Sequence, residues 1–147
     1  MNFFVDVDYT LISASGLLRP HAREMMAQLT GRGHGVFIWS GTGIRRGAMS
    51  RHGLSDLVSD FFVKPVADYE AALRRSDIPV LADMVVDDHT EIVEALGGVS
   101  VRPYFFQNDR DSELLRAARV LLEYADTGRA NDSKFRPPPG RRMTGER

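Results

Sequence analysis

The sequence predicts an α/β fold of the three-layer, Rossmann-like kind, with helices on both faces of a central parallel sheet of five strands. Three observations lead to this prediction. Short apolar runs alternate with helix-like segments five times along the chain. These runs are continuously apolar, which is typical of strands buried on both faces. Four of them end in charged or hydroxyl-bearing residues, as strands that lead to a binding edge do.

The expected helices and strands follow from local composition and from the proline and glycine residues at their ends. Pro20 suits the first turn of a helix, and Gly31 and Gly33 end the apolar spacing that follows it. A fifth apolar stretch, 99–106, contains Pro103, which indicates an edge strand or a break. We expect the other strands at 3–5, 35–40, 61–63 and 84–86, and helices at 22–29, 44–52, 67–75, 90–96 and 112–124.

The totals are those of an ordinary globular domain. The chain has 147 residues, 43% hydrophobic and 27% charged, with a net charge of −1, so nothing in its balance requires a nucleic acid or a membrane as partner. It has no cysteine, which excludes disulfides and thiolate chemistry. No apolar run reaches the roughly 20 residues of a membrane span, and the N-terminus lacks signal-peptide features, so we expect a cytoplasmic protein. We expect one domain over 1–126 and a flexible, basic, proline-containing tail over 127–147.

Polar residues gather where the strands end. The four clear strands lead into Asp6 and Asp8, Ser40, Lys64, and the pair Asp87-Asp88. In a parallel sheet these ends converge on one edge. Carboxylates without histidine or cysteine favour a hard cation, magnesium before zinc. A hydroxyl and an ammonium beside them suit a phosphate, and a carboxylate can act as a nucleophile. For Asp6 and Asp8 taken alone, the alternative is that the first strand ends in a solvated acidic turn.

In this order, Asp6-x-Asp8-x-Thr10, Ser40, Lys64 and Asp87-Asp88 resemble the four motifs of the haloacid dehalogenase-like (HAD) superfamily, over roughly residues 1–107. The resemblance implies that Asp6 is the nucleophile and one metal ligand, and that Asp8 is the general acid and base with its carbonyl on the metal. It implies that Thr10 steadies the loop, and that Ser40 with Gly41 binds the phosphoryl group. Lys64 would offset the negative charge. Asp88 would bind Mg²⁺ directly, with Asp87 bonding Lys64 or the metal's water shell.

The reaction that the resemblance implies is phosphomonoester hydrolysis through a phosphoaspartate, because dehalogenating members lack an acidic residue at the position of Asp8. Tyr9 departs from the family, which often has glycine there, and makes the turn bulkier. There is no room for a cap domain after the first strand or between Lys64 and the fourth strand. The chain therefore resembles the capless class, whose open site suits a bulky substrate, a phosphorylated macromolecule, or a small molecule enclosed by a partner subunit.

Two other functions stay open at this point. A phosphatase acting on nucleotide or polynucleotide ends has only the open site and the basic tail in its support, and a non-catalytic binding module would keep the fold and the metal site. Among neighbouring residues we interpret His89 as a helix start and Trp39 as core. Arg45 and Arg46 follow the Ser40 loop, where they could contact substrate, but we interpret them as a solvated helix face.

Overall fold

The computed structural model describes residues 1–75 and 78–142. Its strands are β1 (Asn2–Asp6), β2 (Gly35–Ser40), β3 (Asp60–Val63), β4 (Met84–Asp87), β5 (Gly98–Ser100) and β6 (Phe135–Arg136). Its helices are α1 (Ala22–Gly31), α2 (Arg46–Arg51), α3 (Tyr69–Arg75), α4 (Thr90–Leu96), α5 (Glu113–Thr127) and α6 (Pro139–Arg142), with a 3₁₀ turn η1 (Ser55–Leu57). The α/β class and the expected alternation of strands and helices are confirmed.

The sheet has six strands in the order β3-β2-β1-β4-β5-β6, and it is mixed. The first five strands are parallel, whereas β6 runs antiparallel to β5. The prediction of a five-stranded, purely parallel sheet is therefore wrong by one strand. The fifth strand is also shorter than expected, because the chain leaves the sheet after Ser100 and before Pro103, which has no N–H for a ladder. Pairing with β6 means that β5 is not an edge.

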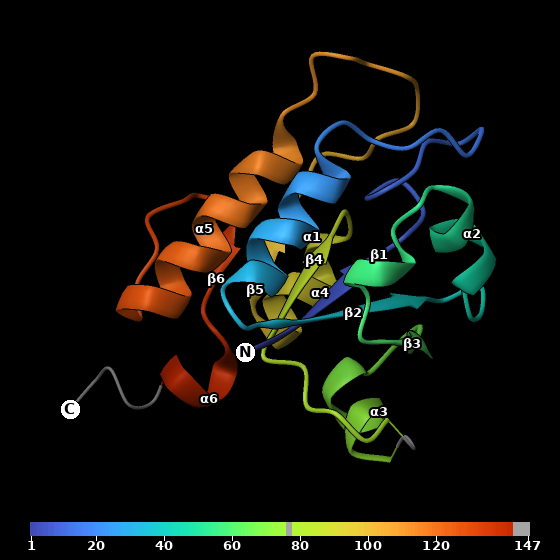
Figure 1. Cartoon of the computed structure of the whole chain (residues 1–147). Helices are drawn as coiled ribbons and strands as arrows, with labels where there is room; N and C mark the ends of the chain where they lie inside the picture. Colours follow the sequence, from blue (N-terminus) through green and yellow to red (C-terminus); the bar gives the residue numbers. More distant parts are fainter. Residues whose placement is uncertain (76–77, 143–147) are drawn as a thin grey trace.

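Helices cover both faces of the sheet (Figure 1). On one face α1 and α5 lie side by side over the alternate residues Phe3 and Val5 of β1, in the larger of two apolar clusters. On the other face Phe4 packs with Trp39 and with residues of α4 in the smaller cluster. The continuous apolar strands are thus buried on both sides, as their composition indicates, and Trp39 is fully buried.

Part of the segment 127–147, expected as a flexible tail, belongs to the sheet. Phe135 is buried, and its ring packs against Tyr124 of α5. The chain then passes over Gly97, where a Cβ atom would lie 2.6 Å from the nitrogen of Pro138. Gly97, which follows α4, therefore leaves room for the returning chain. Residues 143–147 lie outside the described part.

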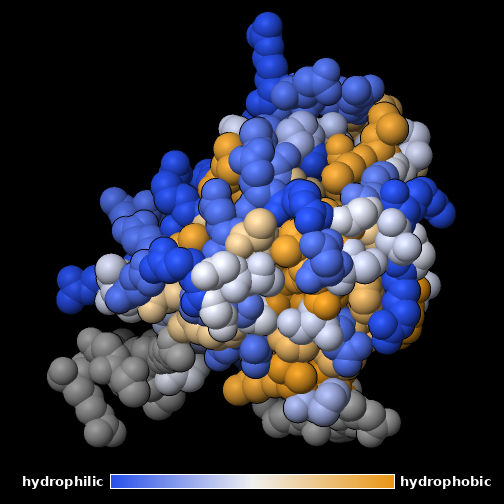
Figure 2. Space-filling view, in the orientation of Figure 1, coloured by the Kyte–Doolittle hydropathy of each residue, from blue (hydrophilic) through white to orange (hydrophobic). Residues whose placement is uncertain are grey.

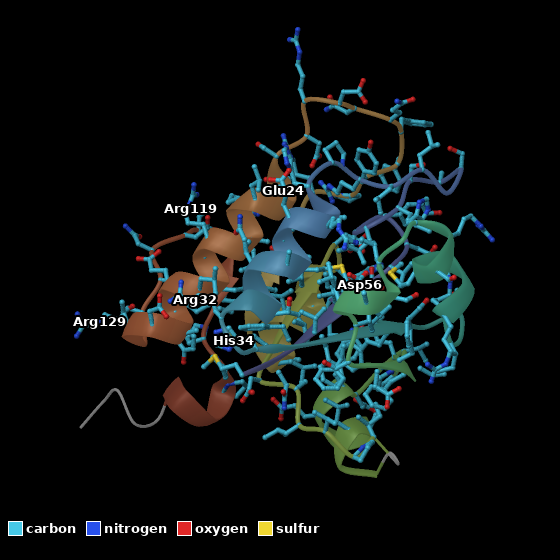
Figure 3. The ribbon with its side chains drawn as sticks, in the orientation of Figure 1. Glu24, Arg32, His34, Asp56, Arg119 and Arg129 are labelled. Carbon is cyan, nitrogen blue, oxygen red and sulfur yellow. The ribbon has the colours of Figure 1, made fainter. Side chains whose placement is uncertain are left out.

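The connections near the carboxyl ends of the strands are short. Residues 7–21 join β1 to α1, and within 64–83 the only described helix is α3, so no described residue forms a further domain at either place. None of the helices in the described ranges is long and apolar enough to cross a bilayer. At the opposite, amino edge, His34 (labelled in Figure 3) contacts the N-terminal amine at 2.9 Å and takes no part in the site described below.

Candidate active site

The sheet register brings the ends of β1, β2, β3 and β4 to one edge. Asp6 ends β1 opposite Trp39, and Ser40 ends β2 opposite Val63, the residue before Lys64. On the other side of β1, Val5 pairs with Val86, so Asp6 and Asp87 lie at the same level. The convergence expected from a parallel sheet is therefore present for all four strands.

Lys64 joins two of these strand ends. Its Nζ donates to Oδ1 of Asp6 at 2.9 Å and to Oδ2 of Asp87 at 3.0 Å. Only 11% of the Lys64 side chain is exposed, against 5% for Asp6 and none for Asp87. A buried ammonium thus lies between two buried carboxylates that come from the neighbouring strands β1 and β4.

The loop after β1 holds a second link between these strands. The main-chain N–H groups of Thr10 and Leu11 both point to the carbonyl of Val7, at 3.2 and 2.9 Å, which folds the chain back on itself. The Thr10 hydroxyl consequently lies 3.0 Å from Oδ2 of Asp6 and 3.3 Å from Oδ1 of Asp88. Tyr9 makes this turn with φ of 64°, a left-handed conformation that glycine adopts without strain.

Burial dominates the electrostatics of this group. It raises the pKa of Asp6 from 3.8 to about 6; Lys64 opposes this rise and the neighbouring Asp88 adds to it. Burial and the Asp6 charge likewise raise the pKa of Asp87 against the effect of Lys64. Burial acts to lower the pKa of Lys64, but the two carboxylates outweigh it and raise that pKa. The lysine is therefore held charged, whereas the carboxylates carry more negative charge than it offsets.

Three consecutive side chains after β4 have the makings of a cation site. Asp87, Asp88 and His89 can each offer a ligand atom, and these atoms lie within 4.8 Å of one another. Asp87 is already bound to Lys64, and its Oδ1 accepts the His89 main-chain N–H at 3.0 Å. Together with Asp6 and Asp8, this donor set is rich in oxygen, which fits Mg²⁺.

A cavity of about 550 Å³ opens in front of these groups. Asp6, Asp8, Ser40, Gly41 and Lys64 all border it. The Ser40 hydroxyl lies 2.9 Å from that of Thr42 and accepts the Thr42 main-chain N–H at 3.2 Å. Thr10 lies behind Asp6, outside the lining, and Asp88 faces a smaller neighbouring cavity of about 250 Å³.

Arg45 belongs to this site, contrary to its interpretation as part of a solvated face. Its Nη1 donates to Oδ2 of Asp8 at 2.6 Å and to the Thr42 hydroxyl at 3.2 Å. The helix α2 begins only at Arg46, so Arg45 still belongs to the loop that follows Ser40. The sequence signal that could have assigned Arg45 to the site is its position, five residues after the strand end at Ser40. Arg46 does lie on the surface, over the Phe61 ring.

Three more residues lie at the edge of the cavity or beside it, and one of them was not expected from the sequence. His89 precedes α4 directly, as expected, and its ring is exposed. Glu91 borders the cavity from the first turn of that helix. Tyr69, at the start of α3, was not foreseen; it borders the same cavity, and burial followed by the Glu91 charge raises its pKa.

Comparison with known proteins does not assign the chain to a family. No family model matches it, and no curated protein or solved structure matches it either. The functional argument therefore depends on the geometry of the site.

Proposed function

We propose that the chain is a Mg²⁺-dependent phosphomonoester hydrolase of the capless HAD type, acting through a phosphoaspartate. The observation that carries this proposal is the position of Lys64, buried between Asp6 and Asp87 at the carboxyl edge of the sheet and beside an open cavity. A buried carboxylate facing a cavity, with a cation beside it and hydroxyls across from it, matches what phosphoryl transfer to a carboxylate requires.

In the first step an Asp6 oxygen attacks phosphorus and the bond from phosphorus to the leaving oxygen breaks. Asp8, two residues on and also bordering the cavity, gives its proton to that oxygen. Ser40 and Gly41 border the cavity where the phosphoryl oxygens would lie, and Lys64 offsets the negative charge gathered there.

In the second step water attacks the phosphoaspartate while Asp8 takes its proton, and the bond from phosphorus to Asp6 breaks to release inorganic phosphate. Asp6, Asp8 and Asp88 would hold Mg²⁺, with Asp87 kept on Lys64. The bound cation supplies charge neutralisation at the phosphoryl group. Thr10 restrains the Asp6 and Asp88 carboxylates relative to each other.

Hydrolysis of 4-nitrophenyl phosphate, with and without Mg²⁺, tests the proposal. We expect turnover by the native chain that depends on Mg²⁺ and is lost in Asp6→Asn. Asp56→Asn is the matched control, because Asp56 is an exposed carboxylate that pairs with Arg23 on the surface. Equal turnover by Asp6→Asn and the native chain would overturn the assignment of the nucleophile.

Rapid acid quenching of Asp8→Asn tests the covalent step separately. Without Asp8 to activate water, the phosphoaspartate should accumulate, and mass spectrometry should locate the phosphoryl group on the peptide containing Asp6. Mg²⁺ binding by a folded chain that turns over neither this ester nor acetyl phosphate would instead favour a non-catalytic binding module.

A further inference from the structure

Tyr9, which borders the catalytic cavity, and two residues of the loop from β5 to α5, Phe105 and Phe106, form what we call the aromatic ledge. The rings of Tyr9 and Phe105 meet edge to face, with centroids 4.9 Å apart. Phe105 is 49% exposed and Phe106 is 81% exposed. Figure 2 shows an apolar area at the upper right, where Figure 1 draws the segment after β1 next to the loop from β5 to α5. Two large rings are thus exposed to solvent, and one of them contacts Tyr9 of the catalytic loop.

The ledge is fixed to the catalytic loop by the main chain. The N–H of Tyr104 donates to the carbonyl of Tyr9 at 2.8 Å, and that of Ala14 donates to the carbonyl of Phe105 at 3.0 Å. Beneath them, the buried Arg19 makes a two-pronged ion pair with Asp111, at 2.8 and 2.9 Å. The same guanidinium reaches the Thr10 carbonyl at 3.2 Å. These bonds hold the exposed rings in a set position relative to Asp6.

Residues of the ledge border two cavities. Tyr9 borders the catalytic cavity, and Phe105 borders a second one of about 500 Å³ formed by the loop from β5 to α5. Besides aromatic rings, this second cavity has hydrogen-bonding groups from Arg102, Gln107 and Asn108. The contact between the Tyr9 and Phe105 rings links the lining of the first cavity to that of the second.

We propose that the aromatic ledge binds the base of a nucleotide whose terminal phosphate lies in the catalytic cavity. This deepens the proposed function and rests on it, since the phosphate would occupy the cavity in front of Asp6. Any of the bases can stack on an exposed aromatic ring, and the edges of the base can form hydrogen bonds with the amide and guanidinium groups of the second cavity. The sugar spans the distance between the two cavities.

The position of Phe105 favours a nucleotide over an aryl phosphate. In an aryl phosphate the ring is bonded directly to the phosphate oxygen, so it would lie inside the first cavity with Tyr9. Phe105 borders only the second cavity, beyond Tyr9. A ring that reaches Phe105 therefore needs a spacer between itself and the phosphate, and a ribose is such a spacer.

Binding of AMP and of ribose 5-phosphate to Asp6→Asn in the presence of Mg²⁺, measured by calorimetry, tests the proposal without requiring turnover. The two ligands share the sugar phosphate and differ by the base. We expect AMP to bind roughly tenfold more tightly, the effect of stacking one base. An oligonucleotide with a 5′-phosphate, measured beside the same oligonucleotide without it, distinguishes a nucleic-acid end from a free nucleotide. Equal affinities for AMP and ribose 5-phosphate, or no binding of either, would overturn the proposal.

Two ledge variants, added to the Asp6→Asn background, show whether the preference comes from the ledge. Phe105→Leu keeps an apolar side chain but removes the ring, and Tyr9→Gly removes the ring while adopting the positive φ without strain. Each should reduce the ratio of the two affinities by several-fold. Leu81→Ala, which alters an exposed apolar residue before β4, should keep the native ratio. An unchanged ratio in both folded ledge variants would contradict the proposal. Absence of phosphatase activity in the native chain would count against the proposed function alone.

Discussion

Two charged clusters in this chain have similar composition, but the pKa of a carboxyl group is raised in one and lowered in the other. At the carboxyl edge, Lys64 lies between Asp6 and Asp87, and burial raises the pKa of Asp6 to about 6. At the start of α5, Arg116 lies between Glu113 and Asp132. Burial acts to raise the pKa of Glu113, but hydrogen bonds and charge from Arg116 and Arg102 outweigh it and lower that pKa to about 2.

The difference lies in how completely each carboxylate is satisfied. Glu113 accepts two guanidinium bonds from Arg116, both at 3.1 Å, and the main-chain N–H of Arg102 at 2.9 Å. Asp6 shares a single ammonium with Asp87, accepts one hydroxyl bond from Thr10, and lies near the Asp88 carboxyl. In the cluster at α5 the Glu113 carboxylate is fully paired with donors, whereas the carboxyl edge has excess negative charge that a cation would offset. This contrast is what we expect between a structural ion cluster and a site that binds a cation.

Removing Lys64, the cation between Asp6 and Asp87, should produce the largest effect. Lys64→Met leaves two buried carboxylates without their partner, so we expect a loss of about 3–5 kcal/mol in unfolding free energy at pH 7, together with loss of phosphatase activity. Urea denaturation followed by circular dichroism measures the first effect. The loss should be smaller at pH 5, because carboxyl groups with raised pKa values then protonate more readily.

Lys134→Met is the matched control for this change, because it alters the only other lysine of the chain, which is exposed. We expect it to shift stability by less than about 0.5 kcal/mol. If the two lysine variants unfolded at the same urea concentration, the ion pairs of Lys64 would not contribute to stability as argued.

Magnesium should distinguish the two clusters directly. If the carboxyl edge takes up the cation, saturating Mg²⁺ should stabilise the native chain by about 2.7 kcal/mol at a hundredfold excess over the dissociation constant. Thermal melting with Mg²⁺ or with EDTA measures this gain. Asp88→Asn should reduce the gain strongly, whereas Glu113→Gln should keep it. A gain that is equal in all three proteins would place the cation elsewhere.

Much of the site could be predicted because it follows from local rules. Short apolar runs alternating with helices specify a parallel sheet, and a parallel sheet brings the ends of its strands together. Asp6, Ser40, Lys64 and Asp87 each follow an apolar run directly, so their convergence needs no knowledge of side-chain geometry. The expected places of His89 and Trp39 follow from the same local signals.

What was missed depends on contacts between distant segments. β6 is two residues long and lies in a basic, proline-rich stretch, so its pattern gives no strand signal; it forms because Phe135 fills a gap beside Tyr124. Arg45 reaches Asp8 across 37 positions, and its partner cannot be read from spacing along α2. The aromatic ledge likewise needs Phe105 to meet Tyr9, which only the folded loops bring together.

Asp6→Asn should stabilise the ligand-free chain at neutral pH, by about 3 kcal/mol. The pKa of Asp6 is higher in the folded chain, about 6, than its ordinary 3.8. The native chain therefore loses stability as pH rises from 3.8 through about 6, and the uncharged asparagine removes this loss. Melting in EDTA should show the variant more stable at pH 8 and the two proteins alike below pH 3.8. A variant less stable than the native chain at pH 8 would mean that the bond from Lys64 outweighs the cost of burying the charge.

Glu113→Gln should show the opposite pH dependence, with a smaller effect of about 1–2 kcal/mol. The pKa of Glu113 is lower in the folded chain, about 2, than its ordinary 4.5. Its contribution is therefore complete above pH 4.5 and disappears as pH falls through about 2. The variant should be less stable than the native chain at pH 7, and the gap should close in acid. Urea titrations at pH 7, 4 and 2.5 would measure this, with Glu123→Gln, an exposed residue of the same helix, as control. The stability difference between Asp6→Asn and the native chain should grow as pH rises through about 6, whereas the difference for Glu113→Gln should vanish only in acid. One pH series therefore tests whether completeness of pairing distinguishes the two clusters.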